Sequence, residues 1–192
     1  MGNSREYNRL YKKGGAGMIF VGIDCGLSGG IAAIDGSEIT LIDTPIIKID
    51  KGKTPKSNKK VKRKYHLWAM CEILNTQKSF AECRVFIERA QAMPGQGVSS
   101  MFSIGYGFAA WEMACVALNI PYEIVGPKAW QKEFGIAGKH TKEESYLKCC
   151  QLYPKQASEL KTVRGRVIDG RADALLIATY GKKKTEVAPN EQ

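Results

Sequence analysis

The sequence predicts an α/β domain in which helices flank a mixed central sheet, an antiparallel three-stranded meander plus parallel strands. Three apolar segments separated by short turns open the ordered part of the chain, and helical patterns then alternate with two further short strands. The expected element order is therefore βββ-α-β-α-β-α-α. Neither an internal repeat nor a shift in composition divides the 192 residues, so we expect one domain over residues 18–182.

The meander occupies the first part of this domain. Residues 18–24 (MIFVGID) are almost continuously apolar, which is typical of a strand covered on both faces. A glycine-rich segment then permits a tight turn into a second strand, residues 30–36, which ends in an Asp-Gly turn. Residues 39–45 are the third expected strand. The polar, glycine-rich residues 1–17 are expected to form a disordered extension.

Helices and strands alternate after the meander. The basic segment 51–64 contains no acid and is expected to be a mobile loop. Thr141 and Glu144 form a capping-box pattern that starts one helix, and Pro154 follows the end of that helix. We expect helices over residues 65–77, 102–118, 141–153 and 173–181, strands over 84–88 and 122–125, a loop over 90–100, a turn or short helix around Trp130, and a loose tail over 183–192.

Composition and charge narrow the class of protein. The net charge of +10 and the pI of about 9.3 favour a polyanionic partner. No apolar run approaches the roughly 20 residues that a membrane span needs, and the N-terminus lacks a secretion pattern, so no membrane partner is expected. The six cysteines contain no CxxC pair, which favours buried free thiols in a reducing compartment.

Carboxylates stand at the edges of three apolar segments. Asp24 closes the first strand, Glu88 closes residues 84–88, and Asp169 and Asp173 open the final apolar stretch. Burying a lone carboxylate costs free energy, so acids this close to the core need a partner. The natural partner is one or two hard divalent cations. Two Mg²⁺ ions about 4 Å apart activate a water and stabilise the leaving oxygen of a phosphodiester. The sequence therefore predicts a metal-dependent nuclease.

The ordered segments GIDCGLSGGIAAID, FIERAQ and DGRADALLIATYG resemble the motifs of the RuvC-like Holliday junction resolvases of the RNase H superfamily. The likeness is closest to the phage-type and plant chloroplast branch, and it covers roughly residues 18–182. It implies an RNase H-like fold and a homodimer that binds a four-way DNA junction and nicks two strands symmetrically. It also implies two Mg²⁺ ions per active site, replaceable by Mn²⁺, no small-molecule cofactor, and a location in the cytoplasm of a bacterial or phage-infected cell.

The resemblance assigns roles to individual residues. Asp24, Glu88 and Asp173 would be metal ligands, with Asp169 as the fourth, although its spacing departs from the bacterial pattern by one residue. Lys142 is the best match for a catalytic lysine at the start of the penultimate helix, and Lys132 is the second. Such a lysine would hold the scissile phosphate or offset transition-state charge. For DNA binding we expect Lys59, Lys60, Lys62, Arg63, Lys64, Lys128, Lys139 and His140, with Met93 or Phe102 in place of the family's junction-centre aromatic residue.

Other interpretations stay open at this point. The segment around Asp24 also resembles the first phosphate loop of the actin and sugar-kinase superfamily, although a second phosphate loop is absent. Asp169 and Asp173 would also suit the N-terminus of a helix. The alternative to DNA binding for the basic run 51–64 is a solvated loop. The alternative functions are a less selective nuclease acting on flaps, forks or RNA–DNA hybrids, and a junction-binding protein without activity.

Overall fold

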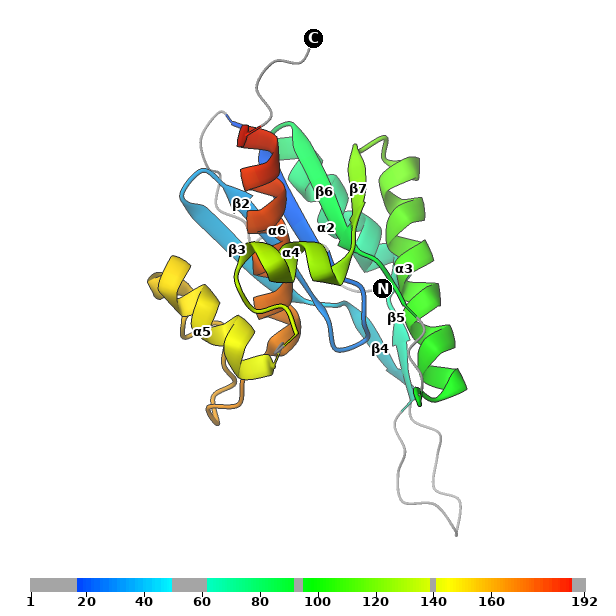
Figure 1. Ribbon diagram of the computed structural model, residues 1–192. Coiled ribbons are helices and arrows are strands. Elements are labelled where there is room, and N and C mark those ends of the chain that lie inside the picture. Colours follow the sequence, from blue (N-terminus) through cyan, green and yellow to red (C-terminus); the bar gives the residue numbers. More distant parts are fainter. Residues whose placement is uncertain (1–16, 50–61, 92–94, 139–140, 188–192) are drawn as a thin grey trace.

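A five-stranded mixed sheet forms the centre of the molecule. The structure is a computed structural model and describes residues 17–49, 62–91, 95–138 and 141–187 (Figure 1). The strands of this sheet are β1 (Ile19–Asp24), β2 (Gly30–Asp35), β3 (Glu38–Asp43), β6 (Cys83–Glu88) and β7 (Tyr122–Val125). Their order is β3-β2-β1-β6-β7, with β1 to β3 antiparallel and β6 and β7 parallel to β1. The predicted mixed sheet, meander plus parallel strands, is confirmed.

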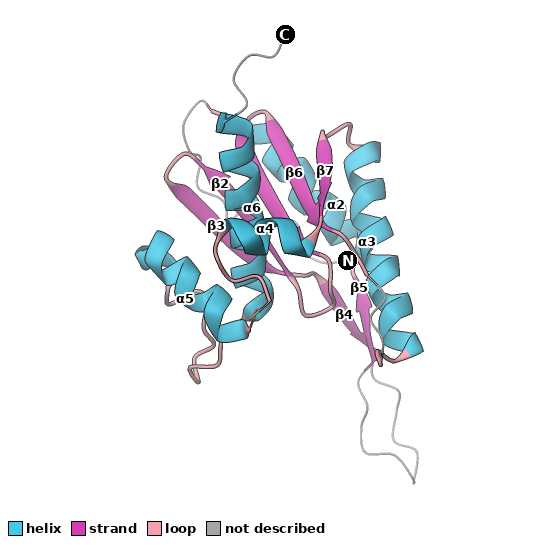
Figure 2. Cartoon of the chain, in the orientation of Figure 1, coloured by secondary structure: helices cyan, strands magenta, loops and turns pink. Residues whose placement is uncertain are grey.

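Helices cover both faces of the sheet (Figure 2). On one face, Trp111 and Ile73 pack into a core with Ile23, and on the other Leu175 and Trp130 pack with Phe86. No helix in the described ranges is long and apolar enough to cross a membrane. The first face carries α2 (Leu67–Phe80) and α3 (Val98–Ala117), and the second carries α4 (Pro127–Glu133), α5 (Lys142–Leu152) and α6 (Asp169–Val187).

The last helix lies directly on the first strand. A Cβ atom at Gly22, in the middle of β1, would collide with the backbone of Ala174 and Ala178 in α6. Glycine at this position therefore lets the helix backbone touch the strand. The contact places the N-terminal end of α6 beside the end of β1.

A two-stranded sheet that the sequence did not predict projects from one end of the molecule (Figure 1). It pairs β4 (Ile46–Ile49) with β5 (Lys62–Tyr65), so the expected loop over 62–64 and helix start at 65 were wrong. Only Tyr65 of β5 is buried and its other residues are exposed and charged, so no apolar alternation marks the strand. Residues 50–61 and 1–16 lie outside the described part of the chain, and with them most of the expected loop and extension.

Two helices are longer than predicted. α6 begins at Asp169 rather than at 173. The sequence did not indicate this start, because Gly170 is a poor helix former. The helix continues to Val187 rather than ending at 181, and its polar end is held by ion pairs of Lys183 and Lys184 with acids of neighbouring elements. α3 begins at Val98, within the predicted loop 90–100, and Ser99 and Ser100 in its first turn interrupt the apolar pattern that would have marked this start.

Candidate active site

Four carboxylates lie at one end of the sheet. The parallel pairing of β1 with β6 brings the last residue of each strand, Asp24 and Glu88, to the same edge. Asp169 and Asp173 lie four residues apart at the start of α6, so they share one side of that helix. The structure therefore brings together the four acids that the sequence selected.

Contact between glycines holds α6 at this edge. Gly29 and Gly170 form an isolated parallel β-bridge. A Cβ atom at Gly170 would collide with the backbone of Gly29, and one at Gly30 would collide with the backbone of Gly170. Position 170 is glycine because two backbones touch there. The bridge places Asp169 next to the loop that follows Asp24.

The charges of the other three acids act on Asp24. The pKa of Asp24 is raised from 3.8 to about 8, first by burial and then by the charges of Glu88 and Asp173, with a smaller effect from Asp169. A hydrogen bond from the Gly26 N–H to Asp24 Oδ1, at 3.2 Å, works in the opposite direction. Such effects require charges that lie close together. The site thus carries an excess of negative charge around Asp24.

Two of the acids have partners from the covering helices. Trp130 Nε1 donates a hydrogen bond to Glu88 Oε1 at 2.9 Å, and Lys142 Nζ lies 2.7 Å from Asp169 Oδ2. Trp130 is fully buried, and a buried indole N–H needs an acceptor, so this bond also orients the Glu88 carboxylate. The best-matched lysine of the sequence, Lys142, is thereby in direct contact with the site.

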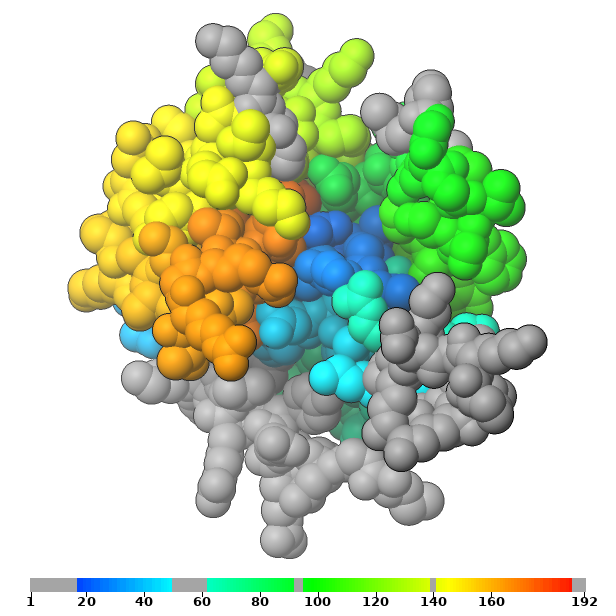
Figure 3. Space-filling model, turned by 90° about the horizontal axis from the view of Figure 1, so that it is seen from below, coloured from blue at the N-terminus to red at the C-terminus, as the bar shows by residue number. Residues whose placement is uncertain are grey.

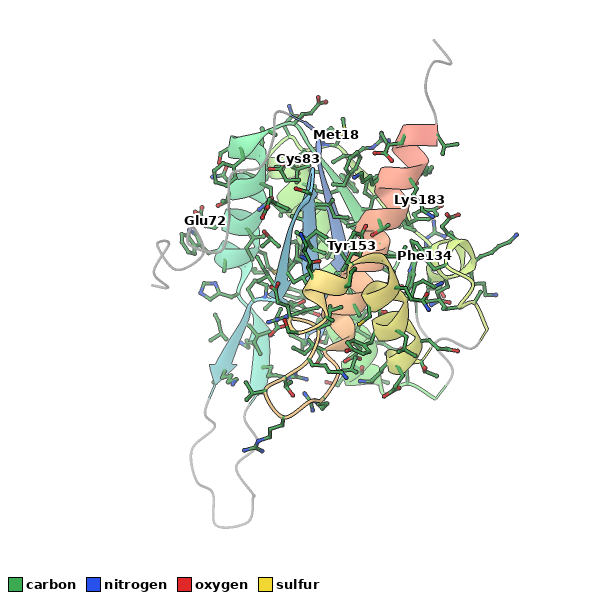
Figure 4. The ribbon with its side chains drawn as sticks, turned by 90° about the vertical axis from the view of Figure 1, so that its left-hand side faces the viewer. Met18, Glu72, Cys83, Phe134, Tyr153 and Lys183 are labelled. Carbon is green, nitrogen blue, oxygen red and sulfur yellow. The ribbon has the colours of Figure 1, made fainter. Side chains whose placement is uncertain are left out.

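The helices that carry these partners are anchored on α6. Figure 4 shows Lys183 beside Phe134, where its ammonium lies 5.2 Å from the ring centroid and 2.8 Å from Glu133 Oε1. Tyr153, directly after α5, places its hydroxyl 2.8 Å from the Thr179 hydroxyl of α6. The two acids of α6 and the partners from α4 and α5 therefore belong to one packed layer.

The four acids supply the oxygen donors that a hard divalent cation prefers. Burial, and then the charges of Glu88 and Asp173, raise the pKa of Asp24, and a bound divalent cation such as Mg²⁺ would offset both effects. Within the described ranges, no three His, Cys, Asp or Glu side chains already form a group that could hold a metal. In this arrangement Glu88 and Asp169 are paired with Trp130 and Lys142.

Cys25 follows Asp24 directly but does not have the chemistry of a ligand. Burial, followed by the charge of Asp24, raises the pKa of its thiol from 9.0 to about 12, and sulfur binds metal as thiolate. All six cysteines are free, as the sequence predicted.

A groove of about 990 Å³ begins at Asp24 and Asp169 and passes between β5 and α3. Lys62, Arg63 and Lys64 line one side of it. Phe102 and Tyr106 of α3 also line the groove, with 75% and 47% of their surfaces exposed. Figure 3 shows this face, with the loop after β1 (blue) between α3 (green) and the segment before α6 (orange). The predicted basic residues of β5 thus lie beside the four acids.

The β4–β5 hairpin is attached to the loop that follows Asp24. Arg63 Nη1 donates to Ser28 Oγ at 2.9 Å, and the Tyr65 hydroxyl donates to the Cys25 carbonyl at 3.1 Å. Sequence reasoning missed this role of Tyr65, as it missed the role of Trp130. A buried tryptophan needs an acceptor for its N–H, but nothing in the sequence around Trp130 identifies Glu88 as that acceptor.

The second catalytic candidate, Lys132, and the remaining predicted DNA-binding residues are less closely connected to the acids. Lys128 and Lys132 are exposed on α4, and neither forms an ion pair within the described part of the chain. Lys59, Lys60, Met93, Lys139 and His140 lie outside the described residues.

Comparison with known proteins identifies the fold. No protein-family profile and no curated protein sequence matches the chain. Among solved structures, it is similar to RuvC of Thermus thermophilus in complex with a Holliday junction substrate, with a TM-score of 0.57, 17% identity, and coverage of 90% of this chain and 97% of that one. A second T. thermophilus RuvC structure matches with a TM-score of 0.53, 17% identity, and coverage of 88% and 96%. The chain thus has the RNase H-like fold of RuvC, as its motifs predicted.

Proposed function

We propose that this chain is an endodeoxyribonuclease that resolves four-way (Holliday) DNA junctions by paired, symmetric nicks, using two divalent metal ions. The observation that carries the proposal is the group of four acids at the end of a basic groove, on a RuvC-like fold. One similar structure is of RuvC with a Holliday junction substrate, which supports a junction as the substrate here. The phage-type branch and the cytoplasmic location stay predictions.

The residues of the site have distinct roles in this reaction. Asp24, Glu88 and Asp173, with Asp169 as the fourth, would hold the two ions, which when bound activate a water and stabilise the leaving oxygen. The indole N–H of Trp130 keeps the Glu88 carboxylate in a fixed orientation. We expect Lys142 to leave Asp169 and to bind the scissile phosphate instead. The ammonium charge of Lys142 would then offset the negative charge of the transition state.

A homodimer is part of the proposal, because a junction offers two equivalent strands to two active sites related by a two-fold axis. One face of α3 supports it. Apolar or small side chains recur on this face every three or four residues, all exposed, and none of them is charged. Small residues between large ones let two helices approach closely. The residues of this α3 face are Phe102, Gly105, Tyr106, Ala109, Met113 and Val116.

Cleavage mapping on an immobile four-way junction tests the function. In Mg²⁺ we expect two nicks at symmetric positions with ligatable ends, and no cleavage in EDTA. A linear duplex, a flap and an RNA–DNA hybrid serve as competing substrates and should be cut far more slowly. Equal cleavage of the flap or hybrid would indicate a less selective nuclease. Tight junction binding without any cleavage by the wild type would indicate a non-catalytic binding protein.

A further inference from the structure

The segment before α6 forms an ordered turn. Lys161 and Val167 pair as an isolated antiparallel bridge, and the Thr162 N–H donates to the Arg166 carbonyl at 2.8 Å. The Gly165 N–H donates to the Thr162 carbonyl at 2.8 Å, and the φ of +78° at Gly165 is one that glycine adopts readily. The Arg166 N–H also donates to Thr162 Oγ1 at 3.1 Å. The 161–166 turn is thus stabilised by its own hydrogen bonds.

The base of this turn is fixed to the body of the protein. Leu160 is fully buried, and the Ile168 N–H donates to its carbonyl at 2.8 Å. Arg171 of α6 donates to the Glu159 carbonyl at 2.9 Å and to Asp43 Oδ1 of β3 at 2.6 Å. The base of the turn is thus held by the core, by α6 and by the sheet.

The tip of the turn is basic and fully exposed. Val163 has 108% of its reference surface exposed, and Arg164 and Arg166 are both exposed. Neither arginine forms an ion pair with any residue that the structure describes. Residues 160–168 contain no acid. The planar guanidinium group matches phosphate geometry, so the two arginines suit a phosphate backbone.

The turn lies next to the four acids. Only Ile168 separates the Lys161–Val167 bridge from Asp169. The turn and the β4–β5 hairpin project from the same end of the molecule, on opposite sides of the start of α6 (Figures 1 and 3). A duplex with one phosphate at the acids therefore has Lys62, Arg63 and Lys64 on one side and the turn on the other.

We propose that the 161–166 turn is a second DNA-binding arm, in which Arg164 and Arg166 bind phosphates beside the cut and Val163 packs against the sugars between them. The inference rests on the proposed function for its ligand, double-stranded arms of a branched DNA. It adds to the proposed interface three residues that the sequence motifs did not select. Together with β5, the turn would hold the substrate from two sides.

The test is the salt dependence of junction binding by the full chain. The affinities of the wild type and of the double variant Arg164→Gln/Arg166→Gln are measured across a series of salt concentrations by fluorescence anisotropy in Ca²⁺. The DNA is a four-way junction in one set and a linear duplex in the other. Each phosphate contact contributes about 0.9 to the slope of log K against log salt, so we expect the slope to fall by about 2. At 0.1 M salt this corresponds to an affinity roughly 10- to 60-fold weaker. Val163→Ser should weaken binding without changing the slope.

The matched control removes the same charge elsewhere. Lys78→Gln/Lys182→Gln changes two exposed or partly exposed lysines of α2 and α6 at the opposite end of these helices from the site, and should change affinity less than 2-fold. An arginine variant with the wild-type slope overturns the inference even if the wild type cuts junctions. A wild type that binds DNA through the turn but cuts nothing overturns the proposed function instead. Folding of each variant is checked by its melting temperature.

Discussion

Asp24→Asn should stabilise the metal-free protein, and more at high pH than at low pH. Asp24 has a folded-state pKa of about 8 against an ordinary value of 3.8. Between these two values the folded state keeps a proton that the unfolded state has lost. The free energy of unfolding therefore falls as the pH rises from about 4 to about 8, and this contribution is fully present only below the unfolded pKa. Asparagine cannot titrate, so the variant lacks this dependence.

The size of the effect follows from the shift. About four pKa units correspond to at most about 6 kcal/mol, and relaxation of a partly exposed site reduces this to about 2–4 kcal/mol. Urea denaturation in EDTA at pH 5 and pH 8.5 gives the free energy of unfolding of both proteins. The effect is the difference in this free energy between wild type and variant at each pH. Mg²⁺ at pH 8.5 should stabilise the wild type and leave the variant almost unchanged. Equal pH dependence of the two proteins would refute the reasoning about the four acids.

Three further substitutions test separate parts of the proposal. Trp130→Phe keeps an aromatic ring in the core but removes the hydrogen bond to Glu88, so we expect a loss of about 1–2 kcal/mol in denaturation and cleavage at least 10-fold slower. Lys142→Met should cost less than about 1 kcal/mol, because its pair with Asp169 is largely exposed, yet lower the single-turnover rate roughly 100-fold with junction affinity preserved. Met113→Lys places a charge on the α3 face and should give monomers in sedimentation that no longer make paired nicks; a stable dimer would place the interface elsewhere.

The sequence predicted the parts of the site that depend on local pattern. Asp24 and Glu88 could be found because an apolar run must end where its strand leaves the core, and an acid at that point is conspicuous. The β4–β5 hairpin could not be found, because Tyr65 is the only residue of β5 that is buried. The start of α6 was missed for a related reason, since Gly170 serves a contact with a distant glycine rather than helix formation.

The contacts that orient the acids were beyond sequence reasoning. Trp130 meets Glu88 across 42 positions of the chain, and Lys142 meets Asp169 only because α5 is packed on α6. Nothing in the local pattern of either segment specifies such a pairing. The resemblance to a family selected Lys142, and the structure supplied the acid it contacts.

The packing of α6 on β1 also bears on when the group of four acids can assemble during synthesis. The first strand of the described chain carries one acid, and the last helix carries two more. A ribosome that has made everything up to α5 has produced a chain with half of the acids and with no helix lying over Gly22. Domains generally fold as units during synthesis. A chain that ends before α6 lacks Asp169 and Asp173, so under the proposed function the site would be complete only once the final helix has packed on β1.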